Sequence, residues 1–224
     1  MKKVNFKWVP SALTEQMKAK RVEIASILLE YLTNASERKL AKIFTQDETW
    51  IYFKNGRDSM WIEAGAQIPT KPRQTIGSKK AMISVIWGIN GIKSITMLPQ
   101  GSKFNKKFFS NCVLEDLNKK IQTKGTYLHM DNAKPHNVPE KLRELKIKRL
   151  DHPPYSPNIA PSDFFLFGYL KKLLEGMEFS NENELFDKVQ EILTSIPKSI
   201  FKYAYNEWMN RLFAVIETHG EYIH

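Results

Sequence analysis

Three aspartates lie where separate elements of regular structure are expected, and their residue type suits metal chemistry. Asp47 interrupts the apolar, strand-like run IFTQDETWIYF, Asp131 follows the strand-like TYLHM, and Asp163 closes the proline-rich YSPNIAPSD. Carboxylate oxygens are the ligands that Mg²⁺ and Mn²⁺ prefer, and two such ions can break and join phosphodiester bonds. The three aspartates are therefore candidate catalytic residues and candidate ligands of two Mg²⁺ or Mn²⁺ ions.

Each aspartate also has an ordinary structural explanation. Asp47 could face water from an edge strand, Asp131 could form a turn after its strand, and Asp163 could cap a helix together with Ser162. A buried ionised carboxylate is costly unless it is paired or binds a metal, and this cost favours a functional role for Asp47. Its neighbour Glu48 should point to the opposite face of the strand, so only one of the two can belong to a shared site.

The pattern of apolar residues and turn signals predicts an α/β fold. The predicted helices cover residues 12–32, 104–121, 138–146, 163–174, 182–193 and 199–218, with Ser11 as the cap of the first. The predicted strands cover residues 43–53, 81–89, 92–98, 126–130 and 147–150, and Asn90-Gly91 favours a hairpin between the second and the third. This order is typical of a ribonuclease-H-like fold, a mixed five-stranded sheet flanked by helices. The first and fourth strands are neighbours in such a sheet, so Asp47 and Asp131 should lie close together.

Composition limits the class of protein. The chain has 224 residues, and 42% of them are hydrophobic, so a substantial core is expected. The net charge of +10 favours nucleic acid as a partner, with a generic basic surface as the alternative. The single cysteine, Cys112, excludes an internal disulfide and a cysteine-based zinc site. Neither a signal peptide nor a membrane-spanning run is visible, so we expect an intracellular protein without a membrane partner, nuclear if its source is eukaryotic.

Several segments resemble motifs of the mariner transposases, and together they extend over essentially the whole chain. YSPNIAPSDFFLF is similar to their YSPDLAPSD-type motif, HMDNAKPH to their HDNAxxH, and TQDETWIYF to their TGDExW strand. FKWVPSALTEQMKAKR resembles their WVPHEL linker, GSKKAMISVIWGINGI their first hairpin, and GEYIH their usual ending. The resemblance implies a DDE/DDD recombinase domain with Asp47, Asp131 and Asp163 as its triad. It also implies double-stranded DNA as substrate and a homodimer.

The sequence departs from the family pattern at four places. Residues 132–162 form a shorter spacer between the second and third acids than the family usually has, and Asn158 replaces an aspartate of the YSPD motif. Met130 separates His129 from Asp131, whereas the family places a histidine directly before that aspartate. The paired helix-turn-helix domains that precede the linker in the family are not present, so sequence-specific DNA binding is not expected of this chain.

The resemblance divides the chain into a linker arm and helix, residues 1–35, and a catalytic domain, residues 36–224. Residues 54–79 resemble the family's clamp loop, and a floppy surface loop is the alternative. The residues expected at a dimer interface are Trp8, Val9, Pro10 and Trp61.

Basic side chains around the candidate site are expected to hold DNA. The candidates for contacts with backbone phosphates are Lys79, Lys80, Lys106, Lys107, His136, Lys171 and Lys172. For each lysine the alternative is a solvated surface position, and His136 could instead orient a carboxylate or simply begin a helix.

Three functions remain open at this level. The first is metal-dependent DNA cleavage and strand transfer. The second is a catalytically silent, basic DNA-binding dimer derived from a transposase. The third is a ribonuclease H acting on RNA–DNA hybrids, which the fold permits because fold does not fix function.

Overall fold

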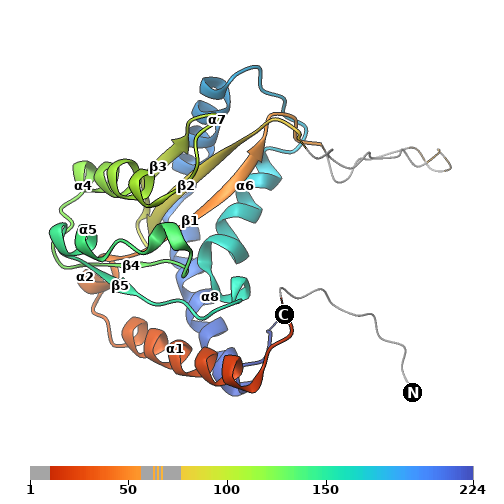
Figure 1. Cartoon of the computed structure of the whole chain (residues 1–224). Helices are drawn as coiled ribbons and strands as arrows, with labels where there is room; N and C mark the ends of the chain where they lie inside the picture. The colour runs from red at the N-terminus through yellow and green to blue at the C-terminus, as the bar shows by residue number, and fades with distance from the viewer. Residues whose placement is uncertain (1–10, 57–62, 64, 66, 68–76, 224) are drawn as a thin grey trace.

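The computed structural model describes residues 11–56, 63, 65, 67 and 77–223 (Figure 1). Its strands are β1 (Ile43–Tyr52), β2 (Lys80–Gly88), β3 (Gly91–Leu98), β4 (Thr126–His129) and β5 (Ile147–Leu150). Its helices are α1 (Glu15–Thr33), α2 (Glu37–Leu40), α3 (Lys106–Phe108), α4 (Glu115–Lys120), α5 (Pro139–Glu144), α6 (Phe167–Leu173), α7 (Glu182–Ser195) and α8 (Lys198–Glu217). Two π-helical segments, Phe109–Leu114 and Ser162–Leu166, lead into α4 and α6.

The five strands form one mixed sheet in the order β3-β2-β1-β4-β5. β1, β2 and β3 pair antiparallel, whereas β4 and β5 continue the sheet in parallel with β1. Thr45 of β1 lies opposite His129 of β4 in this register. The predicted ribonuclease-H-like order and the adjacency of the first and fourth strands are therefore confirmed.

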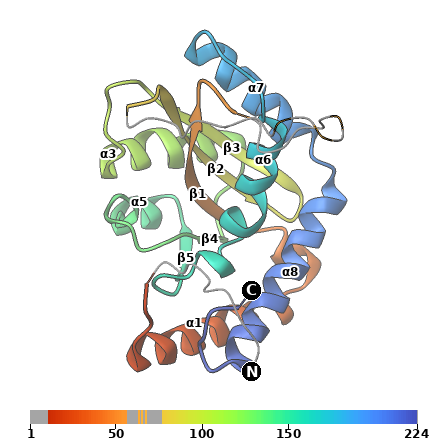
Figure 2. The same ribbon diagram turned by 90° about the vertical axis from the view of Figure 1, so that its right-hand side faces the viewer.

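A separate hydrophobic core lies on each face of the sheet, because side chains of a strand alternate between its faces. The larger core holds Ile51, Val85 and Trp87 from the strands together with buried residues of α1, α6, α7 and α8. The smaller core holds Phe44 and Ile86 and packs against the segment from α3 to α5. Figure 2 shows α3 and α5 on one side of the sheet and α6 and α8 on the other.

Helix α1 is tied to the C-terminal end of the chain by a buried arginine. The Arg21 side chain is fully buried; its Nε donates to the carbonyl of Gly220 at 2.7 Å and its Nη1 contacts the Ser156 hydroxyl. Gly220 has φ +87°, and a Cβ there would lie 2.4 Å from the carbonyl oxygen of Lys18. Only glycine fits this close approach of the C-terminal segment to α1.

Some sequence-based boundaries are wrong. Helix α1 begins three residues later than predicted, and its cap is Thr14, whose hydroxyl accepts from the Met17 N–H, rather than Ser11. The short helix α2 was not predicted at all; Ser36 caps it. The predicted hairpin is present, and Gly91 adopts the positive φ of 105° that its turn requires.

Among the described residues, no helix is both long and apolar enough to cross a membrane.

Candidate active site

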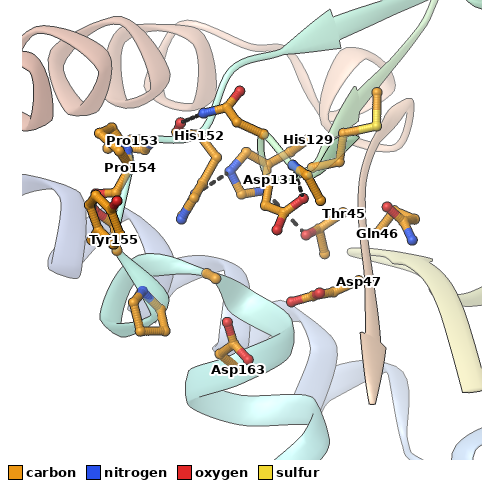
Figure 3. Close-up of a pocket in the computed structure, with 16 residues that line it drawn as sticks. Thr45, Gln46, Asp47, His129, Asp131, His152, Pro153, Pro154, Tyr155 and Asp163 are labelled. Atoms are coloured by element: carbon orange, nitrogen blue, oxygen red, sulfur yellow. Dashed lines mark hydrogen bonds between the residues drawn. The ribbon is translucent and has the colours of Figure 1, made fainter. Parts of the chain in front are cut away.

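The three aspartates line one pocket with a cavity volume of about 450 Å³. Asp47 comes from the middle of β1, Asp131 follows β4, and Asp163 lies in the π-helical segment before α6. Figure 3 shows the three carboxylates facing a common space from different sides. Three segments far apart in the sequence therefore deliver one acidic side chain each to the same cavity.

Asp47 is the innermost of the three acids. Its Oδ1 accepts a hydrogen bond from the backbone N–H of Glu48 at 2.8 Å. Burial raises the pKa of the Asp47 carboxyl well above its usual range, and the negative charges of Asp163, Glu48 and Asp131 raise it further. The carboxylates around Asp47 thus make this part of the pocket electrostatically negative.

Asp131 is held by two hydrogen bonds, both to its Oδ1. The backbone N–H of Ala133 donates at 2.9 Å, and Nδ1 of His136 lies 2.5 Å away. Burial works to raise the pKa of Asp131, but the hydrogen bonds from His136 and Ala133 outweigh it and lower the pKa. Asp131 is therefore the acid of the three that stays ionised most readily.

His136, which the sequence offered as a phosphate contact, lies between the carboxylates of Asp131 and Glu48. Its side chain is completely buried, and its ring nitrogens face Asp131 on one side and Glu48 on the other, at 3.2 Å from Glu48 Oε1. Burial alone would lower the pKa of His136, but the hydrogen bonds with Asp131 and Glu48 raise it to about 9. The alternative stated above, that His136 orients a carboxylate, agrees with these contacts.

Asp163 reaches the pocket from the end of the proline-rich segment. The alternative that Asp163 caps a helix together with Ser162 does not hold, because the segment has no side-chain cap and the Ser162 hydroxyl accepts from Trp87 Nε1 at 3.0 Å. Burial and the charge of Asp131 raise the pKa of Asp163 to about 6, while Lys171 acts in the opposite direction. The shorter spacer before Asp163 leaves it in the same pocket as Asp131.

A pair of buried histidines forms the back of the pocket. His129 Nδ1 lies 3.2 Å from the Thr45 hydroxyl, and its Nε2 lies 3.0 Å from Nδ1 of His152. Burial lowers the pKa of both rings, to about 4 for His152, so the pair is neutral at pH 7. His129 thus lines the pocket although Met130 separates it from Asp131. No sequence signal marked His152, whose place depends on the approach of β5 to β4.

The donor chemistry of the pocket fits a divalent cation. Asp47, Asp131 and Asp163 offer only oxygen ligands, and the neighbouring negative charges that help burial to raise the pKa of Asp47 and Asp163 favour a cation there. Among the described residues, however, no three His, Cys, Asp or Glu side chains already stand in an arrangement that could hold an ion.

The lysines predicted to contact DNA are all exposed. These are Lys79, Lys80, Lys106, Lys107, Lys171 and Lys172. Lys80 Nζ lies over the Trp50 ring at 4.4 Å from its centroid, Lys79 lies over Phe53, and Lys172 pairs with Glu175. Of these lysines, Lys171 affects the electrostatics of Asp163.

The predicted dimer residues Trp8, Val9, Pro10 and Trp61 lie outside the described residues, as does most of the loop 54–79. The base of that loop is described. Its Lys54 forms a bridge and an ion pair with Glu178, and the Asn55 N–H donates to the carbonyl of Met177.

Asn158, which replaces an aspartate of the family motif, does not line the pocket. Its carbonyl accepts from Arg211 Nη1 at 2.9 Å, so it connects the proline-rich segment to α8. The replacement therefore leaves the three-acid site intact.

Comparisons with known proteins agree with the fold and the motifs. Residues 51–129 match the family described as "Transposase (partial DDE domain)", a segment that lies between Asp47 and Asp131. The chain is 31% identical to human "Histone-lysine N-methyltransferase SETMAR", over 96% of this chain and 33% of that protein. It is 30% identical to the "Mariner Mos1 transposase" of Drosophila mauritiana, over 78% of this chain and 54% of that protein.

A solved structure of the same transposase extends the match to three dimensions. The "Mos1 transposase paired-end complex with left transposon end" superposes with a TM-score of 0.88 at 26% identity, covering 100% of this chain and 68% of that one. The chain spans about a third and about half of the length of the two curated relatives above. On the motifs, the sheet order and these matches, the chain carries a DDE domain of the mariner transposase type.

Proposed function

We propose that this chain cuts DNA strands and joins them to new ones, using divalent metal ions held by Asp47, Asp131 and Asp163. The observation that carries the proposal is the convergence of these three acids on one pocket, with charges that affect one another's pKa. A basic chain with a net charge of +10 suits a polyanionic substrate.

The relatives support both the substrate and the metal. Structures of the Mos1 transposase are described as a "Strand Transfer Complex" and as paired-end complexes with Mn and with Mg. When bound, a pair of Mg²⁺ or Mn²⁺ ions would activate the attacking hydroxyl and stabilise the leaving oxygen. Asp47, Asp131 and Asp163 would hold these ions through their carboxylate oxygens.

The residues of the chain itself have separate parts in this proposal. The neutral pair His129 and His152 closes the back of the pocket without adding charge. The exposed Lys171, close enough to act on Asp163, would hold a backbone phosphate beside the ions. Double-stranded DNA would be bound by a homodimer, as the resemblance of the linker arm and the loop 54–79 implies.

Nicking of a supercoiled plasmid in the presence of Mn²⁺ tests the proposal. Wild type should convert the plasmid to open circles, and Asp131→Ala should do so at least about a hundredfold more slowly, since even outer partners of a metal site cost up to that much. Asp187→Asn is the matched control, because Asp187 is exposed on α7 and lies outside the pocket.

The same assay distinguishes this function from that of a catalytically silent DNA-binding dimer. If wild type and Asp131→Ala bind the plasmid in a salt-dependent way but neither nicks it, the chain is a DNA-binding protein only. Cleavage confined to RNA–DNA hybrids would point instead to ribonuclease H activity.

A further inference from the structure

We infer that His136 is a positioning residue, which fixes the Asp131 carboxylate for metal binding and is itself held by Glu48 from the other face of the sheet. The inference rests on the proposed function, because it concerns how one of the metal ligands is held. His136 touches neither DNA nor metal in this account.

The position of His136 leaves its ring no freedom. The side chain is completely buried, and the ring packs against Phe104 and Phe109 with centroid distances of 6.1 and 4.7 Å. Nδ1 lies 2.5 Å from Asp131 Oδ1 and Nε2 lies 3.2 Å from Glu48 Oε1. Rotation of the ring would break both contacts inside an apolar core, which is costly for a buried polar group.

Glu48 is fixed as firmly as the ring that it contacts. Only 15% of its side chain is exposed, and its Oε1 accepts from the hydroxyl of Ser84 at 3.2 Å and contacts Nε2 of Gln46. Gln46 in turn donates to Ser84 at 3.0 Å, so all three side chains brace one another on that face. A side chain with this many partners can act as a fixed reference point for His136.

The result is a chain of contacts from Glu48 through His136 to Asp131. It crosses from the face of β1 opposite the pocket to the pocket itself. Among the described residues, both hydrogen bonds to the Asp131 carboxyl fall on Oδ1. Oδ2 therefore keeps its lone pairs for a cation, while Oδ1 determines how the carboxyl group is turned. Outer partners of metal ligands commonly have this function.

Two substitutions whose side chains resemble part of the His136 ring can each keep one of its two contacts and remove the other. In His136→Asn, the side-chain amide takes the place of Nδ1 and can still donate to Asp131. In His136→Gln, the amide takes the place of Nε2 and can donate to Glu48 but not to Asp131. If His136 served only to fill the core, the two variants would bind metal equally.

The test is the affinity of the full chain for Mn²⁺, followed by the electron paramagnetic resonance of the free ion. We expect His136→Asn to bind within about threefold of wild type, and His136→Gln to bind about 10- to 100-fold more weakly. Thermal unfolding by circular dichroism verifies that both variants are folded. Glu48→Gln keeps the shape of its side chain but not its charge, and should weaken Mn²⁺ binding severalfold even if His136→Gln does not fold.

The outcomes distinguish this inference from the proposed function. Wild type that binds Mn²⁺ no better than Asp131→Ala would contradict the proposed function, and the inference would fall with it. Wild type that binds through Asp131, together with folded His136→Asn and His136→Gln variants of equal affinity, would overturn the positioning role of His136 alone. Wild-type affinity in Glu48→Gln would overturn the part assigned to Glu48.

Discussion

Asp47 and Glu48 are consecutive residues of β1 whose carboxylates lie on opposite faces of the sheet. Asp47 lines the pocket that Asp131 and Asp163 also line, whereas the Glu48 side chain contacts Gln46, Ser84 and His136 on the other face. The alternation of side chains along a strand produces this separation. The carboxylate of Asp47 therefore faces the pocket, whereas the carboxylate of Glu48 faces His136 on the other side of the sheet.

Removal of the Asp47 charge should stabilise the metal-free protein. Burial and the negative charges of Asp163 and Glu48 make the ionised Asp47 unfavourable. Asp47→Asn should therefore raise the free energy of unfolding by about 1 kcal/mol, measured by urea unfolding at pH 7.5 with a chelator present. With Mn²⁺ added, wild type should gain stability and the variant should not.

Asp187→Asn on α7 is the control for this experiment, since an exposed position should change stability by less than about 0.5 kcal/mol. A loss of stability in metal-free Asp47→Asn would show that the pocket does not disfavour its own charges.

The stability of the metal-free protein should depend on the charge of His136. The pKa of this ring is raised from 6.5 to about 9, so the folded state binds a proton that the unfolded state releases. The contribution of protonated His136 to the free energy of unfolding is fully present below pH 6.5 and is lost as the pH rises through 9. The difference in unfolding free energy between wild type and His136→Asn should shrink over this range. A difference that stays constant from pH 6 to 9.5 would contradict the assigned protonation.

Mn²⁺ binding should weaken on acidification. The pKa of Asp163 is raised to about 6, and a metal ion requires the ionised carboxylate, so protons compete with the ion below this pH. Between pH 7.5 and 5.5 the affinity should fall roughly fourfold from Asp163 alone, and further from Asp47. Isothermal titration at the two pH values measures the change. Equal affinities would mean that neither acid is a ligand.

The contact between the C-terminal segment and α1 should tolerate no side chain at Gly220. A Cβ there would lie 2.4 Å from the Lys18 carbonyl oxygen, at a φ of +87°. Gly220→Ala should lower the free energy of unfolding by about 2 kcal/mol or more.

Gly101→Ala is the matched comparison for that variant. Gly101 also has a positive φ, +75°, but apart from its chain neighbours no atom of the described residues lies within 4 Å of the position that its Cβ would take. Gly101→Ala should therefore lower the free energy of unfolding by only about 1 kcal/mol, which is the cost of the backbone strain alone. Equal losses in thermal unfolding for the two variants would show that the contact with Lys18 contributes nothing.

Local patterns in the sequence were sufficient to predict the sheet. The apolar runs, the Asn90-Gly91 turn and the order of the elements predicted the arrangement of strands that the structure has. Asp47 and Asp131 could be paired in advance because the first and fourth strands are neighbours in a ribonuclease-H-like sheet. Asp163 was a candidate from its place at the end of the proline-rich segment, and the motif resemblance supported it, because strand pairing alone could not place it beside the other two.

Features that depend on packing between distant segments could not be predicted. Arg21 is fully buried because Gly220 and Ser156 approach it from the other end of the chain, whereas a lone arginine on a helix is expected at the surface. The π-helical turn at Ser162–Leu166 has no signal of its own in the sequence. The place of His152 in the pocket also depends on packing between distant segments, because its ring contacts His129.

The position of bound metal is the sharpest test of a metal site formed by the three aspartates. Crystals of the full chain soaked in Mn²⁺ would be measured at the manganese absorption edge. We predict anomalous peaks within about 2.5 Å of carboxylate oxygens of Asp47, Asp131 and Asp163. Manganese bound elsewhere, or a pocket without a peak at saturating Mn²⁺, would show that the three aspartates do not form a metal site.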